Sequence, residues 1–242
     1  MNELPKLSEE EYCAIIDALF LLSLEKPKIL RHNFDSDFFI HLQGLISGTL
    51  ENCISAYELI KNNRFYAAST VVRSAFEHAI VAVYLHLSKN GVEEAAYLSR
   101  KSIDDLMRMA TEAQAPSMSN EKFIRPEFSV EENMEFLTKP NKLHEKFSQS
   151  QFLKDIYFVL SQNAHPISAS YMFCEYDSEK GIKVIRRTSL HSDAVTLLPH
   201  IFRLSALVLL IDAEISNQSK LLEAINLLIS KEGFNPNLTL KD

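Results

Sequence analysis

Glycine is scarce in this chain, with 5 glycines among 242 residues. Few positions can therefore take the positive φ angles that tight turns require, which argues against a many-stranded sandwich, barrel or propeller. The hydrophobic and charged fractions, 46% and 24%, are instead those of a globular chain that can bury a sizeable core. Together with the helical spacing of its apolar residues, this composition predicts a mainly all-α protein.

Cysteine is also rare, and the three cysteines lie far apart, at Cys13, Cys53 and Cys174. This pattern excludes a disulfide framework and any CxxC pair for zinc or redox chemistry. Six of the eight histidines show no ligand spacing with one another or with acidic residues; they are His32, His41, His86, His144, His191 and His200. We therefore expect no metal ion and no other cofactor.

The chain lacks an excess of positive charge and lacks a long apolar run. Its 25 Lys and Arg against 32 Asp and Glu give a net charge of −7, which disfavours broad adsorption to nucleic acid or anionic lipid, so RNA contact would need a local patch. Apolar runs such as 204–211 are shorter than the roughly 20 residues of a membrane span. The acidic start MNELPKLSEEEY does not resemble a signal peptide. These features predict a cytoplasmic protein without membrane contact.

Apolar periodicity and capping residues predict a helical domain over residues 1–242. Its bundle comprises about 8–115 and 150–230, joined by an irregular connection over 116–149 with a short helix near 130–137; a linker between two domains is the alternative. The expected helices cover about 8–25, 35–62, 65–88, 93–115, 150–164, 193–211 and 219–229. The helix over 65–88 is apolar nearly all round, which places it at the centre of the bundle.

Two local features interrupt this helical pattern. Alternating residues around the turn at 177–181 predict a small β-hairpin inserted near 169–187. Gly44 and Gly48 lie inside a helix, where each glycine costs about 1 kcal/mol relative to alanine, so we expect another helix to approach closely there.

The central helix carries the most informative polar residues. Ser69, Arg73 and Glu77 are four residues apart and share one helix face. One interpretation is an Arg73–Glu77 pair that ties helices together. The other is a site where Arg73 presents its guanidinium to a phosphate or carboxylate while Glu77 orients it. His78 lies about 140° from Arg73 around the helix, so the two side chains are not expected to enter one small pocket.

A second group of polar residues ends the helix over 150–164. Tyr157, Ser161 and His165 are again four residues apart, and Pro166 makes the backbone leave the helix directly after the histidine. This histidine is a candidate for proton transfer, or simply a histidine that the helix dipole favours at a C-terminus.

The hairpin region holds a short basic cluster, which consists of Lys183, Arg186 and Arg187. We single out this cluster as a candidate contact for RNA. An edge strand that uses cations to prevent aggregation explains this cluster equally well.

The segments VVRSAFEHAIVAVYL and YFVLSQNAHP resemble the uncharacterised bacterial helical proteins of the DUF5677 type. Those families pair an R-x3-E helix with a later S-x3-H motif, matched here by Arg73, Glu77, Ser161 and His165. They are similar in outline to the HEPN superfamily, which includes metal-independent ribonucleases of toxin and anti-phage systems with an R-x4-6-H motif. In this chain Ser74 follows the arginine, where the HEPN motif has Asn, Asp or His.

We expect a helical bundle that forms a homodimer, and if the protein is an enzyme, the resemblance implies that it cleaves RNA. His165 or His78 would act as the general base on a 2′-hydroxyl, Arg73 would stabilise the developing phosphorane charge, and Glu77 would hold the arginine. Two alternatives stay open. One is a non-enzymatic interaction or regulatory protein, such as an accessory or antitoxin-like subunit with a protein partner, and the other is a small-ligand sensor.

Overall fold

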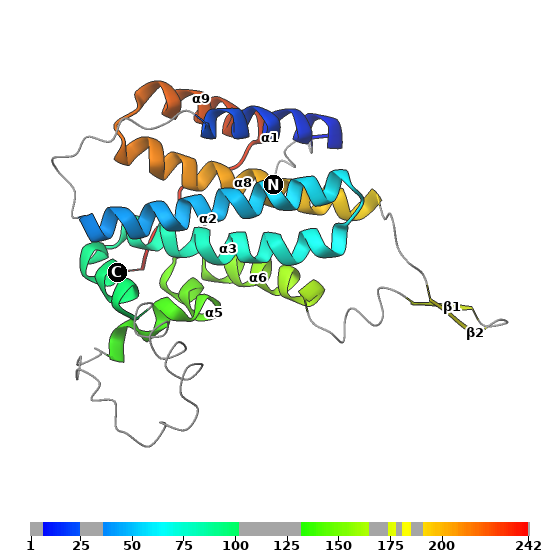
Figure 1. Cartoon of the computed structure of the whole chain (residues 1–242), viewed down its shortest axis with the longest axis horizontal. Helices are drawn as coiled ribbons and strands as arrows, with labels where there is room; N and C mark the ends of the chain where they lie inside the picture. The colour runs from blue at the N-terminus through cyan, green and yellow to red at the C-terminus, as the bar shows by residue number, and fades with distance from the viewer. Residues whose placement is uncertain are drawn as a thin grey trace, which may run out of the picture.

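The computed structural model describes residues 7–24, 36–101, 132–164, 174–177, 181–184 and 191–241. Their architecture is an all-α multi-helix bundle with one small hairpin (Figure 1). The long helices are α1 (Glu9–Ser23), α2 (Ser36–Lys61), α3 (Phe65–Leu87), α6 (Ser150–Ala164), α8 (His191–Ile215) and α9 (Ser219–Glu232). Three short turns of helix precede α6: η1 (Glu132–Thr138), α5 (Pro140–Leu143) and η2 (His144–Lys146).

The predicted helices agree with these bounds to within a few residues. The short helix expected near 130–137 is a 3-10 helix, η1, and the apolar helix expected from Asp193 begins at His191. Residues 91–101 are helical, whereas the rest of the helix expected over 93–115 lies outside the described residues.

Local capping explains where the first long helix begins and where the last one ends. Ser8 and Glu11 form a reciprocal capping box at the start of α1, as the acidic first turn predicts. Gly233 ends α9 in the left-handed conformation, with φ of 79°, and its N–H donates to the carbonyl of Ile229. Gly91 opens the helix that follows α3, and a Cβ at Gly91 would clash with the carbonyl oxygen of Leu85.

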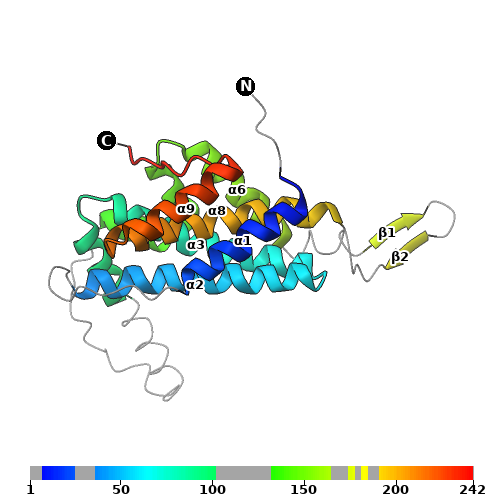
Figure 2. The same ribbon diagram turned by 90° about the horizontal axis from the view of Figure 1, so that it is seen from above.

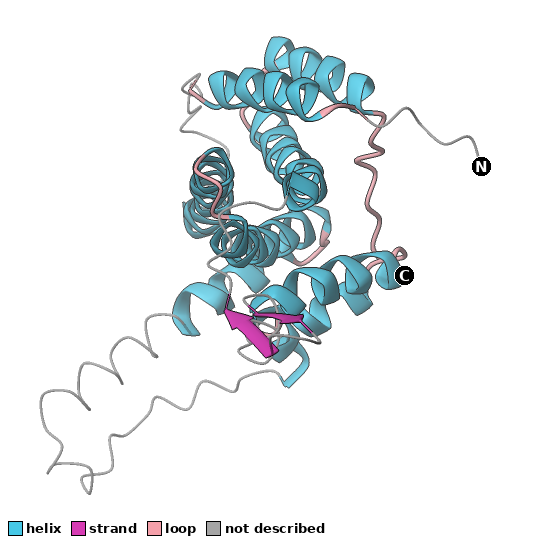
Figure 3. Cartoon of the chain, turned by 90° about the vertical axis from the view of Figure 1, so that its right-hand side faces the viewer, coloured by secondary structure: helices cyan, strands magenta, loops and turns pink. Residues whose placement is uncertain are grey.

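Two helices, α3 and α8, occupy the middle of the bundle. α3 packs against α2, α6 and α8, and α8 packs in addition against α1 and α9. Figure 1 shows α1 and α9 on one side of α8, with α2 and α3 on the other and α6 beyond α3, and Figure 2 views the same bundle from the side of α1 and α9. Figure 3 looks along the long axis of this arrangement. The central position predicted for α3 is confirmed.

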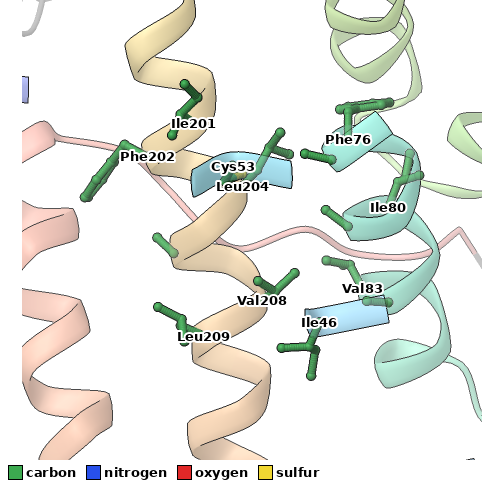
Figure 4. Packing of buried hydrophobic residues seen from close by; sticks show 14 of the residues in the cluster. Ile46, Cys53, Phe76, Ile80, Val83, Ile201, Phe202, Leu204, Val208 and Leu209 are labelled. Carbon is green, nitrogen blue, oxygen red and sulfur yellow. The ribbon is translucent and has the colours of Figure 1, made fainter. Parts of the chain in front are cut away.

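A continuous apolar core lies between these helices. Figure 4 shows Ile80 and Val83 of α3 near the side chains of Leu204 and Val208 of α8. Residues from α1 to the segment after α9 belong to this cluster, so the parts of the chain before and after 116–149 share one core.

The helix α8 corrects one sequence-based expectation. Its segment Thr196–Ile215 is long and apolar enough to cross a membrane, although runs such as 204–211 suggested that no stretch reaches that length. Within the bundle 67% of this segment is buried, which is the pattern of a core helix.

The predicted hairpin is present as β1 (Cys174–Asp177) and β2 (Gly181–Val184). The strands are antiparallel, with Glu175 opposite Lys183 and Tyr176 opposite Ile182. Figures 1 and 2 both draw the hairpin beyond one end of the bundle.

The two glycines inside α2 differ in their surroundings. A Cβ at Gly48 would lie 3.1 Å from Nδ1 of His78, which confirms a close approach by α3. A Cβ at Gly44 would meet nothing within 4 Å, so the close approach predicted there is wrong. Gly44 is exposed, and no described residue approaches it.

The sequence did not suggest a role for the segment after α9, yet this segment packs beside the start of α6. Leu240 forms an antiparallel bridge with Phe147, and the Ser148 N–H donates to the Thr239 carbonyl at 2.9 Å. Phe147 is fully buried, so this pairing anchors the C-terminal segment to the core.

Candidate functional site

Arg73 lies between α3 and α6 and is held by two side chains. Its Nε donates to Oε1 of Glu77 at 3.2 Å, and its Nη2 donates to the hydroxyl of Tyr157 at 2.8 Å. The guanidinium carbon also lies 5.1 Å from the centre of the Tyr157 ring, which adds a cation–π contact. Because the glutamate, the tyrosine hydroxyl and the ring all constrain it, the guanidinium has a defined orientation.

The Arg73 site is partly open to solvent. The side chains of Arg73 and Glu77 are 28% and 32% exposed. A guanidinium carries five N–H groups, and two of them serve Glu77 and Tyr157. No other described residue accepts a hydrogen bond from it, so its remaining donors suit a phosphate or carboxylate.

The predicted Arg73–Glu77 pair that ties helices together is confirmed only in part. The Arg73–Glu77 pair is present, but both residues belong to α3, so this pair does not itself join two helices. The connection between helices is the hydrogen bond from Arg73 to Tyr157 on α6. Tyr157 is further supported by Phe76, whose ring centre lies 6.1 Å from its own.

The two serines of the predicted site have different roles. Ser69 is buried, and its hydroxyl donates to the backbone carbonyl of Tyr66 at 2.8 Å, which satisfies it within α3. Ser161 lies one turn beyond Tyr157 on α6 and is also buried, but its Oγ has no hydrogen-bond partner among the described residues. A buried hydroxyl without a partner costs about 1–3 kcal/mol, which makes Ser161 the stronger candidate to contact a ligand.

His78 does not join Arg73. Its Nδ1 lies 3.3 Å from the amide nitrogen of Asn52 on α2, and its ring packs over Gly48. Arg73 contacts α6 and His78 contacts α2, as their predicted separation around the helix requires. The remaining predicted residues, His165, Arg186 and Arg187, lie outside the described residues.

Sequence reasoning missed a second arginine cluster, which is more deeply buried. Arg203 of α8 donates from Nε and Nη2 to Oε1 of Glu232 at 3.0 and 2.6 Å, and the hydroxyl of Tyr12 on α1 donates to the same oxygen at 2.9 Å. The Glu232 side chain is 0% exposed. Burial, followed by the hydrogen bond to Glu232, raises the pKa of Tyr12 to about 12.

Two other buried carboxylates were also missed. Glu94 accepts a hydrogen bond from the hydroxyl of Tyr84 at 2.8 Å, and Asp212 accepts one from the side-chain amide of Gln43 at 2.6 Å. Their partners are 10 and 169 residues away in the sequence, and neither separation corresponds to neighbouring positions on one helix face. The only hint was the presence of acidic residues at apolar-facing helix positions.

The described residues contain no group of three or more His, Cys, Asp or Glu side chains that could hold a metal ion. The described residues of the candidate site are Arg73, Glu77, Tyr157 and Ser161. No family model, curated protein or solved structure matches the chain.

Proposed function

We propose that the Arg73 site binds the phosphodiester backbone of RNA and that the protein is a metal-independent ribonuclease. The observation that carries the proposal is the arginine itself, which is held by Glu77 and Tyr157 and is still 28% exposed. Preorganised donors that reach solvent are suited to an oxyanion whose charge grows during a reaction.

Glu77 and Tyr157 have a positioning role in this mechanism. Glu77 holds Nε and keeps the guanidinium plane fixed, and Tyr157 holds one Nη2 hydrogen. The other side of the guanidinium then faces the non-bridging phosphate oxygens as a planar fork. Replacing arginine by lysine would keep the charge and lose this fork.

The proposed reaction is an attack by the ribose 2′-hydroxyl on the adjacent phosphorus. A general base removes the hydroxyl proton, the 2′-oxygen bonds to phosphorus, and the bond to the 5′-oxygen breaks, which leaves a 2′,3′-cyclic phosphate and a 5′-hydroxyl. His165 is the proposed base, because it follows Ser161 by four residues and an imidazole is the side chain best suited to exchange a proton near neutral pH. Arg73 stabilises the extra negative charge on the phosphorane.

The test is cleavage of a fluorescent single-stranded RNA by the purified chain without added metal and with a chelator present. Arg73→Gln and His165→Gln should each lower the rate by about 100-fold or more, in the range expected for a lost oxyanion donor or general base. The matched control is Arg64→Gln, which removes one exposed positive charge from the start of the same helix. Equal rates for folded wild type, Arg73→Gln and His165→Gln would remove these residues from the mechanism.

A non-enzymatic interaction protein is the second candidate, and one observation favours it. The solvent face of α6 exposes Phe152, Phe158 and Val159 to 51%, 60% and 55%. Large apolar side chains that cluster on a surface are typical of protein contact sites. In this case Phe158→Ser would abolish assembly with a partner, or with a second copy, while Arg73→Gln would not.

A further inference from the structure

A second candidate site lies on the other side of Phe76 from Tyr157. A cavity of about 50 Å³ lies between α3, α6, α8 and the segment after α9. Phe76 lines this cavity and also contacts Tyr157, but the cavity does not include Arg73, Glu77 or Ser161. It is therefore separate from the proposed RNA site.

The surface of the cavity is almost entirely apolar. Ile80 comes from α3, Ile156 from α6 and Leu204 from α8, and these side chains offer no hydrogen-bonding group. Protein cores rarely leave spaces larger than a water molecule, and apolar spaces stay dry and take apolar molecules. A cavity of about 150 Å³ holds benzene, so this smaller one suits the end of a short alkyl chain.

The edge of the cavity toward solvent is formed by its partly exposed lining residues, which come from α6, α8 and the segment after α9. Phe152 at this edge is 51% exposed, whereas Ile156, Phe234 and Leu238 are half-buried. A ligand can therefore place its apolar end inside while its other end stays near solvent.

A guanidinium lies at this edge. Arg203 lines the cavity, is 32% exposed and lies 5.5 Å from the ring centre of Phe234, which also lines it. Nε and Nη2 of Arg203 are bonded to Glu232, and no described residue accepts a hydrogen bond from Nη1. Because Glu232 neutralises one charge here, a singly charged carboxylate fits better than a dianionic phosphate.

The other polar residue of the wall, His200, does not compete for the ligand's charge. Burial, with the nearby Arg203 as a smaller cause, lowers the pKa of His200 to about 4. His200 is therefore neutral at pH 7, and Arg203 is the cation that remains at this edge.

We propose that this cavity is a binding site for a short aliphatic carboxylate, whose alkyl end lies between α3, α6 and α8 and whose carboxylate is bound by Arg203. The proposal concerns a different site from the one proposed to cleave RNA. Either of the two can therefore fail without the other.

The test is a titration of the isotopically labelled protein with sodium pentanoate, followed by the methyl NMR signals of Ile80, Ile156 and Leu204. Acetate supplies the head group without the tail, and 1-pentanol supplies the tail without the charge. We expect saturable binding of pentanoate that is at least about 10-fold tighter than that of acetate or pentanol, since a charge-assisted hydrogen bond and the burial of methylene groups are each worth that much.

Two variants locate the ligand. Ala79→Ile fills the cavity and should weaken pentanoate binding by about 10-fold or more. Leu204→Ala enlarges the cavity and should shift the preference to heptanoate, a gain that a damaged fold would not produce. Arg73→Gln is the control and should leave pentanoate binding unchanged.

Three results would overturn the proposal: non-saturable shifts, equal affinity for pentanoate and acetate, or loss of pentanoate binding in Arg73→Gln. The last result would place the carboxylate at the other arginine. Melting curves of each variant establish that it is folded before the titration.

Discussion

The bundle contains two clusters made of the same three residue types, and their settings differ. In the first, Arg73 is bonded to Glu77 and Tyr157, and both charged side chains are about one-third exposed. In the second, Arg203 is bonded to Glu232, which also accepts from Tyr12, and the glutamate is fully buried. An arginine, a glutamate and a tyrosine thus make a solvent-facing site in one place and a core cross-link in the other.

The direction of the tyrosine hydrogen bond reflects this difference. The Tyr157 hydroxyl accepts a hydrogen bond from Arg73, so it orients the guanidinium while the remaining N–H groups stay available to an anionic ligand. Tyr12 donates to Glu232, so it satisfies a buried anion and ties α1 to α9. We therefore assign RNA binding to Arg73 of the first cluster. In the second cluster, Glu232 and Tyr12 stabilise the fold, while the partly exposed Arg203 is also proposed to bind a carboxylate.

The largest expected contrast is between the two glutamates. Glu232→Gln should lower the free energy of unfolding by about 3 kcal/mol, because it leaves Arg203 and Tyr12 without their buried anionic acceptor. Glu77→Gln should lower it by less than about 1 kcal/mol, because its pair is exposed and lies within one helix. Urea unfolding of both variants measures the contrast, and equal losses would show that the two clusters do not differ in kind.

The second prediction concerns pH and rests on His200, which lines the cavity near Arg203. The pKa of His200 is lowered from 6.5 to about 4 in the folded protein, so between these pH values the unfolded chain binds a proton that the folded protein does not. Stability should therefore fall as the pH falls from 6.5 to 4, by up to about 3 kcal/mol from this residue.

Urea unfolding across that pH range, with His200→Gln as the comparison, isolates the effect from titrating carboxylates. The variant should show a shallower fall than the wild type. Identical pH profiles would mean that His200 is hydrated in the folded state.

The third contrast replaces each tyrosine by phenylalanine. Tyr12→Phe should cost about 1.5 kcal/mol, the value of a buried hydrogen bond to a charged group, and Tyr157→Phe less than about 0.5 kcal/mol. The pKa of Tyr12 is raised from 10.0 to about 12, so its contribution is present below pH 10 and is lost as the pH rises toward 12. A penalty for Tyr157→Phe as large as that for Tyr12→Phe would contradict the assignment.

The smallest expected effects concern the glycines of α2. Gly44→Ala should stabilise the protein by about 1 kcal/mol, because the new methyl group meets open space and alanine favours the helix. Gly48→Ala should lack this gain, because its methyl group would press on the His78 ring. Melting temperatures compare the two, and an equal gain in both would show that His78 moves freely and does not pack firmly against α2.

Most of the fold could be predicted because its signals are local. Ser8 and Glu11 cap α1 through residues three apart, and the apolar residues around α3 predict its central place. The Arg73–Glu77 pair belongs to the same class, since residues four apart on a helix are neighbours. The link from Arg73 to Tyr157 spans 84 residues and could not be read from spacing.

The second cluster could not be predicted for the same physical reason. Tyr12 and Glu232 are 220 residues apart, and each lies in a helix whose own pattern is complete without the other. The close approach predicted at Gly44 was wrong because the low helix propensity of glycine marks an unfavourable position in a helix. It does not show whether another helix packs there. Such contacts arise only when the helices have packed.

The measurement that tests the central assignment most directly is the affinity for a single-stranded RNA whose 2′-hydroxyls are replaced by fluorine, so that binding proceeds without cleavage. Fluorescence anisotropy would compare the wild type, Arg73→Gln and Arg64→Gln at fixed salt. The account predicts that Arg73→Gln weakens binding by about 10-fold or more while Arg64→Gln changes it by less than about 3-fold, because only Arg73 is held in place for a phosphate. Equal affinities for wild type and Arg73→Gln would contradict it.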